Sequence, residues 1–333
     1  MNVSLEYLQR CSAQTGYRVE QLEKSVRLGG MAADVTRHPF LGAVLALKGG
    51  TAFHLCFGPP QRLSLDLDYN YIGHLDRAAM LEARPEVEQA VADLARRQGY
   101  RVQQSADAFA GRKYYLFYRS VVGPEERIEV DLNFLFRLPI AGTELRDLWQ
   151  PGELDRPRVR VVSLEEILIG KFLALLDRGA VRDAWDIAYP PQSTVEILQS
   201  LRFRQWFIAL SCILEHPLST YTRAHLEASM TDRDITERLS PMLAGAAPSR
   251  MELIERAWSS IGGFLSLEPN EQAFIAAVQQ GELKPELLFP DDLGESGRLV
   301  VHPAILWKIQ NVKNYLARPT GQKKRGGFAK RRK

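Results

Sequence analysis

Cysteine is scarce in this sequence, and long apolar runs are absent from it. The three cysteines among 333 residues are far apart, without the spacing of metal ligands, so neither a disulfide framework nor a zinc site is indicated. No apolar run reaches the roughly 18 residues of a membrane-spanning helix. The first residues form no charged and apolar leader. These absences predict a cytoplasmic protein without a membrane segment.

The sequence also lacks the short motifs of several large enzyme classes. It contains no Gly-x-Ser-x-Gly, no His-Glu-x-x-His and no Walker A pattern. It therefore gives no support to an α/β-hydrolase, a zinc protease or a P-loop enzyme. His54 and His74 have no partner at a catalytic or metal-binding spacing, so we expect them to have core or surface roles.

The composition is ordinary for a globular protein, but the charge is unevenly distributed. Apolar residues make up 45% and charged residues 25% of the chain, and its length suits two domains. The net charge is +3, yet eight basic residues and no acid fall in 318–333, so the rest of the chain carries a net −5. Such an arm either binds nucleic acid through its charge or is a solvated terminus. We predict a core with N-terminal helices over 1–157, a helical domain over 158–317 and a basic disordered tail over 318–333.

The most informative stretch is 48–70, where a glycine turn precedes two aspartates. Apolar and polar residues alternate here, which predicts a half-buried strand over 62–72. The alternation places Asp66 and Asp68 on one face, about 7 Å apart at Cα. Two carboxylates held this close repel each other unless a cation lies between them, and oxygen ligands beside phosphate suit Mg²⁺.

The residues before this strand predict a phosphate-binding turn. Gly49 and Gly50 would let backbone N–H groups approach the β- and γ-phosphates of a nucleotide, and a short helix begins at Thr51. Ser64 and Arg62 share the parity of the aspartates. Ser64 could hydrogen-bond a phosphate or orient an aspartate, and Arg62 could neutralise a phosphate or pair with Asp66. A phosphate cradle followed by a metal-binding strand is the layout of a nucleotidyl-transfer site. Two Mg²⁺ ions about 3.5–4 Å apart would stabilise the attacking and leaving oxygens there.

Further charged residues are candidates for the same site. Asp131 lies on a predicted strand over 127–136 and could be a third metal ligand or the base for the incoming nucleophile, although Glu129 shares its face and could substitute. Lys171, within an apolar helix, either reaches solvent or points into a cleft beside the triphosphate. Asp186 lies on the next predicted helix. A neighbouring group is more simply an ion-pair network between these two helices: Arg178, Arg182 and Asp183.

The remaining pattern predicts an α+β fold in which a core with a mixed sheet precedes a mostly helical region. Pro85 marks the first turn of a predicted helix over 84–98, and three strands follow that helix. Residues 137–162 form a predicted connector that ends in an extended segment. Ser163 and Glu166 have the spacing of a capping box, and from there the chain is mostly helical.

Together these motifs resemble those of a known family. The stretch 47–52, followed by Arg62-x-Ser64-x-Asp66-x-Asp68, is similar to the first motif of the AbiEii/AbiGii nucleotidyltransferase toxins. Those proteins are the toxin half of type IV toxin–antitoxin and phage abortive-infection systems. Similarity to the family's later motifs is carried by Ser163-Leu164-Glu165-Glu166, Lys171-x-x-Ala174-Leu175, Arg178, Arg182-Asp183-x-x-Asp186 and, in long members, His302-Pro303-Ala304, Trp307-Lys308 and Asn311.

The resemblance implies a fold like the DNA polymerase β-type nucleotidyltransferase core, followed by a helical C-terminal region. It implies that Gly50 and Thr51 contact the nucleotide phosphates, with Ser64 close by. It also implies that Asp66 and Asp68 bind Mg²⁺. The 14-residue spacer between Thr51 and Asp66 is slightly longer than is usual in the wider superfamily.

The same resemblance implies essential roles for Lys171, near the triphosphate, and for Asp186, with Asp131 at a less regular third acidic position. The implied reaction is Mg²⁺-dependent transfer of a nucleoside monophosphate from a nucleoside triphosphate (NTP) to an acceptor such as tRNA or another RNA. The implied partner is a separately encoded antitoxin. Two alternatives stay open at this point: a protein or small-molecule acceptor, and a non-catalytic RNA-binding module.

Overall fold

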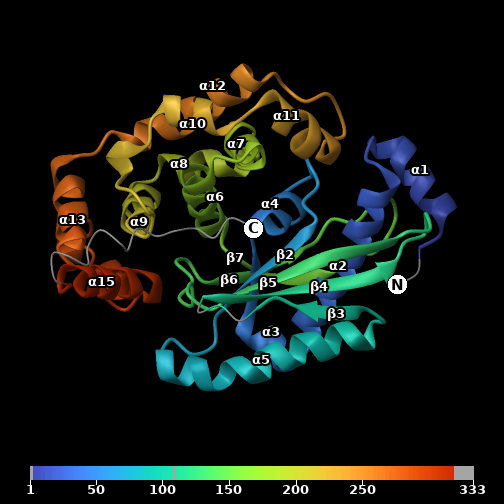
Figure 1. The fold of residues 1–333 in the computed structure, drawn as a ribbon, viewed down its shortest axis with the longest axis horizontal. Helices are drawn as coiled ribbons and strands as arrows, with labels where there is room; N and C mark the ends of the chain where they lie inside the picture. Colours follow the sequence, from blue (N-terminus) through green and yellow to red (C-terminus); the bar gives the residue numbers. More distant parts are fainter. Residues whose placement is uncertain (1–2, 107, 109, 319–333) are drawn as a thin grey trace.

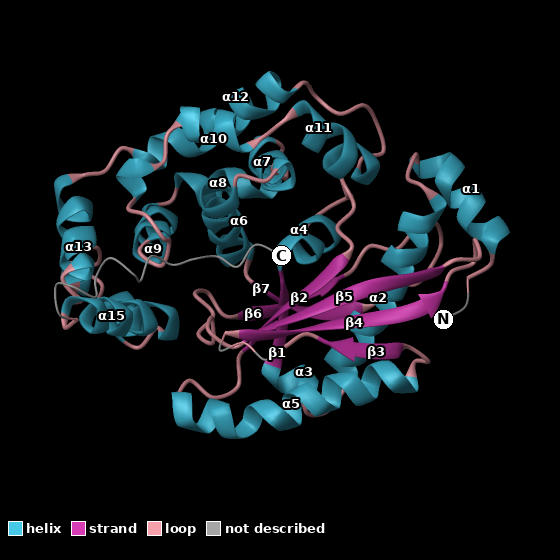
Figure 2. Ribbon diagram, in the orientation of Figure 1, coloured by secondary structure: helices cyan, strands magenta, loops and turns pink. Residues whose placement is uncertain are grey.

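A seven-stranded mixed sheet in the order β3-β4-β5-β2-β1-β7-β6 forms the centre of the molecule (Figures 1 and 2). The computed structural model describes residues 3–106, 108 and 110–318, so the predicted basic tail lies outside it except for Arg318. Strand β2 pairs in parallel with β5 and antiparallel with β1, which pairs in parallel with β7. The strands are β1 Leu45–Lys48, β2 Asp66–Tyr71, β3 Arg101–Gln104, β4 Gly111–Arg119, β5 Glu125–Asn133, β6 Thr143–Asp147 and β7 Arg158–Val162.

Helices cover both faces of this sheet. Figure 1 shows α5 along one face and α4, α6 and α7 on the other. The alternation along β2 explains the arrangement, because Leu67 and Tyr69 are buried whereas Asp66 and Asp68 are partly exposed. The helices that precede or interrupt the sheet are α1 Leu5–Thr15, α2 Val19–Arg37, α3 Leu41–Val44, α4 Gly49–Cys56 and α5 Arg77–Arg97.

Beyond β7 the described chain is helical, as predicted. Edge-to-face contacts join Phe172 of α6, Phe203 and Phe207 of α9 and Phe264 into one aromatic cluster in the core of this region. No helix in the described ranges is long and apolar enough to cross a membrane. The α-helices here are α6 Leu164–Arg178, α7 Val181–Ala188, α8 Val195–Gln199, α9 Leu201–Ser211, α10 Arg223–Ser229, α11 Asp232–Asp234, α12 Arg250–Ile261, α13 Pro269–Gln279, α14 Leu293–Val300 and α15 Pro303–Leu316.

The α+β prediction is confirmed, but the predicted start of α5 is wrong. The helix begins at Arg77, and Pro85 lies in its interior instead of its first turn. Asp76 sets the start, because its side chain accepts a hydrogen bond of 2.9 Å from the backbone N–H of Ala79. Proline removes one backbone donor from the helix, and the cap together with the packing of the long helix outweighs that loss.

The predicted strand over 62–72 is also too long. Strand β2 starts at Asp66, and Arg62 instead forms an isolated bridge with Leu243 in the helical region. The side-chain alternation of the strand therefore does not extend to Arg62. The predicted connector over 137–162 contains a missed strand, β6, whose sequence is mostly polar because it lies at the sheet edge and is largely exposed.

The predicted capping box at α6 is only half formed. Ser163 accepts a hydrogen bond of 3.2 Å from the N–H of Glu166, as predicted. The Glu166 carboxylate accepts from Asn70 Nδ2 at 3.0 Å and from the N–H of Ile140 at 2.9 Å. These buried donors draw the carboxylate away from the backbone N–H of Ser163, which a complete box requires.

Candidate active site

The turn between β1 and α4 accepts only glycine at two positions. Gly49 has a φ of +71°, and a Cβ atom there would overlap the Asp68 carboxylate. A Cβ at Gly50 would come within 2.5 Å of Ser64 Oγ. The bare backbone thus leaves the N-terminus of α4 open beside the aspartates, where N–H groups and the helix dipole favour an anion.

The Thr51 hydroxyl has a structural partner in this turn. It donates to the backbone carbonyl of Asp66 at 2.5 Å, with the carbonyl of Ser64 at 3.3 Å. The Thr51 side chain is buried, and Ser64 is nearly so. The hydroxyl therefore fastens α4 to the start of β2, which holds the phosphate turn against the aspartates.

Two neighbouring strands carry four carboxylates in register, which we call the acid array: Asp66, Asp68, Glu129 and Asp131. The parallel pairing of β2 with β5 sets Asp66 beside Glu129 and Asp68 beside Asp131. Burial raises the pKa of Asp66, and the charges of Asp68 and Glu129 raise it further. Burial likewise raises the pKa of Asp131, with a contribution from Asp68 that Lys113 opposes. The register thus places the three predicted metal-binding aspartates on adjacent strands, and burial opposes the negative charges of Asp66 and Asp131.

The donor chemistry of the acid array fits Mg²⁺. Among the described residues, no three His, Cys, Asp or Glu side chains converge closely enough to enclose a metal ion. Mg²⁺ needs no such enclosure, because it keeps several waters and is held by one or two carboxylates together with substrate phosphates. Asp66 and Asp68 beside the phosphate turn supply carboxylates of this kind.

A second charged group, which we call the Asp186 hub, surrounds a carboxylate with no exposed surface next to α4. Arg62 donates from Nε and Nη2 to the Asp186 carboxylate at 2.7 and 2.8 Å. Lys171 Nζ lies 2.6 Å from the same carboxylate and His54 Nε2 lies 2.7 Å from it. Burial alone would raise the pKa of Asp186, but the charges of Arg62 and Lys171 outweigh it and hold this pKa well below its usual range.

The hub carries one net positive charge. Burial, helped by the charge of Arg62, lowers the pKa of His54 to about 4, so the neutral ring donates to Asp186. Two cations then face one carboxylate. The hub adjoins the phosphate turn, because a Cβ at Gly50 would lie 3.4 Å from Arg62 Nη2. Both predicted phosphate cations, Arg62 and Lys171, contact Asp186. Lys171 also lines the cavity that contains the phosphate turn, which agrees with the prediction that it points into a cleft.

A cavity of about 420 Å³ opens beside the phosphate turn and the aspartates. Its polar part is lined by Lys48, Gly49, Gly50, Asp68 and Lys171, and α6 forms a long wall. Its apolar lining includes residues of β7, α6, α9 and the segments that follow β5 and α9: Val162, Ile167, Leu173, Leu210, Phe136, Ile213 and Leu214. The combination of a charged end with an apolar wall suits a nucleotide, whose triphosphate and base have these two characters.

Asn70 and Glu166 form a buried polar pair in the cavity wall. Burial raises the pKa of Glu166 to about 7, and the N–H of Ile140 opposes the rise. From its sequence pattern Glu166 was expected only in a helix cap. No role was expected for Lys48, whose charge acts on both Glu166 and Asp131. Lys48 could have been singled out from its place next to the glycines. The cavity position of Glu166 depends on non-local contacts that carry no sequence signal.

The predicted ion-pair network between α6 and α7 is confirmed for two of its members. Arg178 Nε and Nη2 donate to Asp183 at 2.5 and 2.7 Å. The charge of Arg182 acts on the acid array, where it opposes the raised pKa of Asp66. The second helix therefore contributes a cation that faces the predicted metal site.

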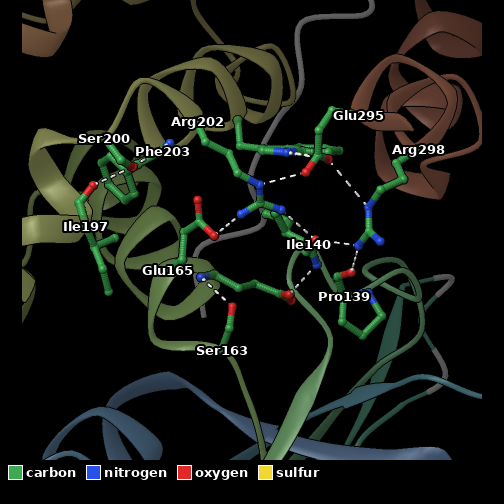
Figure 3. Close-up of polar contacts among 12 residues, drawn as sticks. Pro139, Ile140, Ser163, Glu165, Ile197, Ser200, Arg202, Phe203, Glu295 and Arg298 are labelled. Atoms are coloured by element: carbon green, nitrogen blue, oxygen red, sulfur yellow. Dashed lines mark hydrogen bonds and ion pairs between the residues drawn. The ribbon is translucent and has the colours of Figure 1, made fainter. Parts of the chain in front are cut away.

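A cluster of arginines fixes the helical region to the loop that supports Glu166 (Figure 3). Arg202 of α9 donates to Glu295 of α14 at 2.7 Å, binds Glu165 of α6, and donates to the carbonyl of Ile140 at 2.9 Å. Arg298 of α14 donates to the carbonyl of Pro139 at 2.5 Å. The N–H of Ile140 in turn binds Glu166. The cavity wall is therefore assembled from both halves of the chain.

A mixed sheet with a glycine phosphate turn and an Asp-x-Asp strand defines the class of nucleotidyltransferases. A family model described as the nucleotidyl transferase AbiEii toxin of a type IV toxin–antitoxin system matches residues 33–274. The chain belongs to this family, which confirms the resemblance noted from its motifs. It is a nucleotidyltransferase toxin of a type IV toxin–antitoxin system.

A solved structure supports the fold. MenT4, a nucleotidyltransferase toxin from Mycobacterium tuberculosis H37Rv, superposes with a TM-score of 0.57 and is 16% identical in sequence. The alignment covers 92% of this chain and 99% of MenT4. A comparison with curated proteins gave no match. At this level of identity the structural likeness establishes the shared fold.

Proposed function

We propose that this toxin transfers a nucleoside monophosphate from an NTP to an RNA acceptor, with tRNA as the first candidate, and releases pyrophosphate. The observation that carries the proposal is that Gly49, Gly50 and Asp68 line one cavity. A phosphate-binding turn and a metal-binding carboxylate at one cavity are what the reaction needs, because phosphoryl-type transfer depends mainly on positioning and charge stabilisation.

Each part of the site has a role in this proposal. The backbone of Gly49 and Gly50 and the N-terminus of α4 hold the β- and γ-phosphates. Asp66, Asp68 and Asp131 hold Mg²⁺, which neutralises charge on the phosphates when bound. Asp131 suits the third position better than Glu129, because Glu129 is paired with Lys113 at 3.1 Å and with Arg127 at 3.0 Å, whereas the contact of Asp131 with Lys113 is longer, at 3.7 Å.

The Asp186 hub supports the phosphate turn from behind. Its net positive charge attracts the triphosphate. Lys171 lines the cavity and acts on the phosphates from there, whereas Arg62 acts from behind the turn. Thr51 fastens the helix to β2, and Ser64 lies at the turn. A cytoplasmic location, phage defence and a separately encoded antitoxin belong to the same proposal, as does a division near residue 157 into a catalytic core and a helical domain.

The positive charge of the sequence over 318–333 favours an RNA acceptor, because basic segments bind phosphate backbones. The test is incubation of the purified chain with each labelled NTP, Mg²⁺ and bulk tRNA. We expect label on tRNA with at least one NTP and none with Asp66→Ala. No transfer from any NTP to tRNA would contradict the RNA acceptor. A screen of protein hydroxyls and aminoglycosides would then test the alternative acceptors.

A cellular experiment separates catalysis from simple RNA binding. We expect expression of the chain to arrest growth of the host and Asp66→Ala to relieve the arrest. Unchanged toxicity of Asp66→Ala would favour a non-catalytic binding module.

A further inference from the structure

One cation of the sheet itself reaches into the acid array. Lys113 lies on β4, directly beside Asp131 of β5 in the antiparallel register. Its Nζ is 3.1 Å from Glu129 Oε2 and 3.7 Å from Asp131 Oδ2, so the ammonium group bridges two of the four carboxylates. Its charge also acts on Asp66 of the next strand. Lys113 thus contacts Glu129 and Asp131, and its charge also reaches Asp66.

The contacts of Lys113 differ from those of an ordinary surface ion pair on the same sheet. Arg101 and Glu125 pair at 2.7 Å with side chains that are 60% and 57% exposed, where such a pair contributes little. The Lys113 and Glu129 side chains are 37% and 22% exposed. Less water surrounds them, so the charge of Lys113 is less screened at the carboxylates.

We propose that Lys113 is a built-in counter-cation of the acid array that lowers its affinity for a free divalent ion. The inference rests on the proposed metal site at Asp66, Asp68 and Asp131. Lys113 on β4 and Arg127 on β5 pair with carboxylates of the array, and the charges of Lys48 and Arg182 also act on it, so the array carries little excess charge to attract a free ion. The metal then enters together with the NTP, whose own phosphates supply the missing negative charge and ligands. Lys113 is in this sense a positioning residue for metal entry.

A metal titration of the nucleotide-free, full-length chain tests this inference. Free Mn²⁺ is measured by electron paramagnetic resonance for the unmodified chain and for Lys113→Met, Lys113→Arg and Arg127→Met. Arg127→Met is the matched control, because it removes the same charge and also frees Glu129, but from a side chain that is 50% exposed. Thermal unfolding of each variant confirms that it is folded.

We expect Lys113→Met to bind Mn²⁺ about tenfold more tightly than the unmodified chain, because a charge within about 4 Å of the ligands is removed. Arg127→Met should differ from the unmodified chain by less than about threefold. Lys113→Arg should restore weak binding. Asp68→Asn in the Lys113→Met background should abolish the gain, which locates the tighter site at the acid array.

Three results would overturn the inference. An equal gain in Mn²⁺ affinity in Lys113→Met and Arg127→Met would show that the effect comes from net charge and not from the position of Lys113. Unchanged affinity in a folded Lys113→Met would show that Lys113 does not compete with the metal. Absence of Mn²⁺ binding in every variant, with NTP as well as without it, would remove both this inference and the proposed metal-dependent function. Because the titration needs no acceptor, failure of RNA transfer alone would leave the inference standing.

Discussion

The acid array and the Asp186 hub both contain buried or partly buried carboxylates, but cations bind the carboxylate of the hub whereas the carboxylates of the array lie beside one another. In the hub, a carboxylate with no exposed surface is bound by Arg62, Lys171 and His54. In the array, four carboxylates share two strand registers, and burial together with mutual repulsion raises the pKa of Asp66. In the hub, the carboxylate is bound directly by oppositely charged groups. In the array, the carboxylates of neighbouring strands repel one another, and a bound cation would relieve that repulsion.

This difference separates structural from chemical roles among the predicted site residues. A buried charge without its partner is strongly destabilising, so the hub residues are needed for folding as much as for phosphate attraction. Carboxylates that repel one another cost stability and gain value only when a cation binds. Mutations at the two sites should therefore affect different measurements.

The largest effect is expected for Asp66→Asn, on activity. Loss of one metal-binding carboxylate should lower kcat/KM for nucleotide transfer by about a hundredfold to a thousandfold, the scale of removing one preorganised charge interaction. Because the pKa of Asp66 is raised, its ionised form opposes folding near neutral pH, so Asp66→Asn should be as stable as the unmodified chain or slightly more stable. Transfer assays and urea unfolding measure the two effects. A marked loss of stability would place Asp66 among the structural residues.

Asp186→Ala should show the reverse pattern. It leaves Arg62 and Lys171 buried without their shared carboxylate, which should cost about 3–5 kcal/mol of unfolding free energy. Burial already prevents any direct contact of Asp186 with substrate. Urea unfolding at neutral pH checks the value, with Asp183→Ala as a control for an ion pair whose arginine is 60% exposed. Full stability of Asp186→Ala together with lost activity would contradict the structural reading of the hub.

The sequence was sufficient for the local parts of both sites and insufficient for their partners. Alternation in β2 identified Asp66 and Asp68, and the glycine pair identified the phosphate turn, because both signals depend on neighbouring residues. The parallel register of β2 with β5 depends on strand pairing between distant segments, and so does the position of Lys113 beside Asp131. Arg62 was assigned to the carboxylate face because β2 was extended too far. Its true partner, Asp186, is 124 residues away.

Glu166 lies between the two types of site, since it is buried like the hub but faces the cavity. Burial raises its pKa to about 7 in the folded protein, above the usual value of a glutamate, so its favourable contribution to stability is complete below about pH 4.5 and is lost as the pH rises through about 7. Glu166→Gln should remove this loss and be more stable than the unmodified chain at pH 8 by up to about 3 kcal/mol. At pH 5 the difference should be much smaller. Thermal unfolding at both pH values tests it, and an equal difference at the two would contradict the raised pKa.

The smallest effect is expected for Thr51. Its substitution distinguishes a hydroxyl that binds phosphate from one that binds the protein backbone. Thr51→Val keeps the shape and removes the hydroxyl that donates to the Asp66 carbonyl. The loss of this buried hydrogen bond should cost about 1–2 kcal/mol of stability. The KM for NTP should change by less than about threefold, because the hydroxyl serves the protein backbone, and a contact with phosphate would be worth more than that. Thr51→Ser, which keeps the donor, should recover most of the lost stability. A large rise in the KM for NTP with unchanged stability would instead show that the Thr51 hydroxyl contacts the nucleotide.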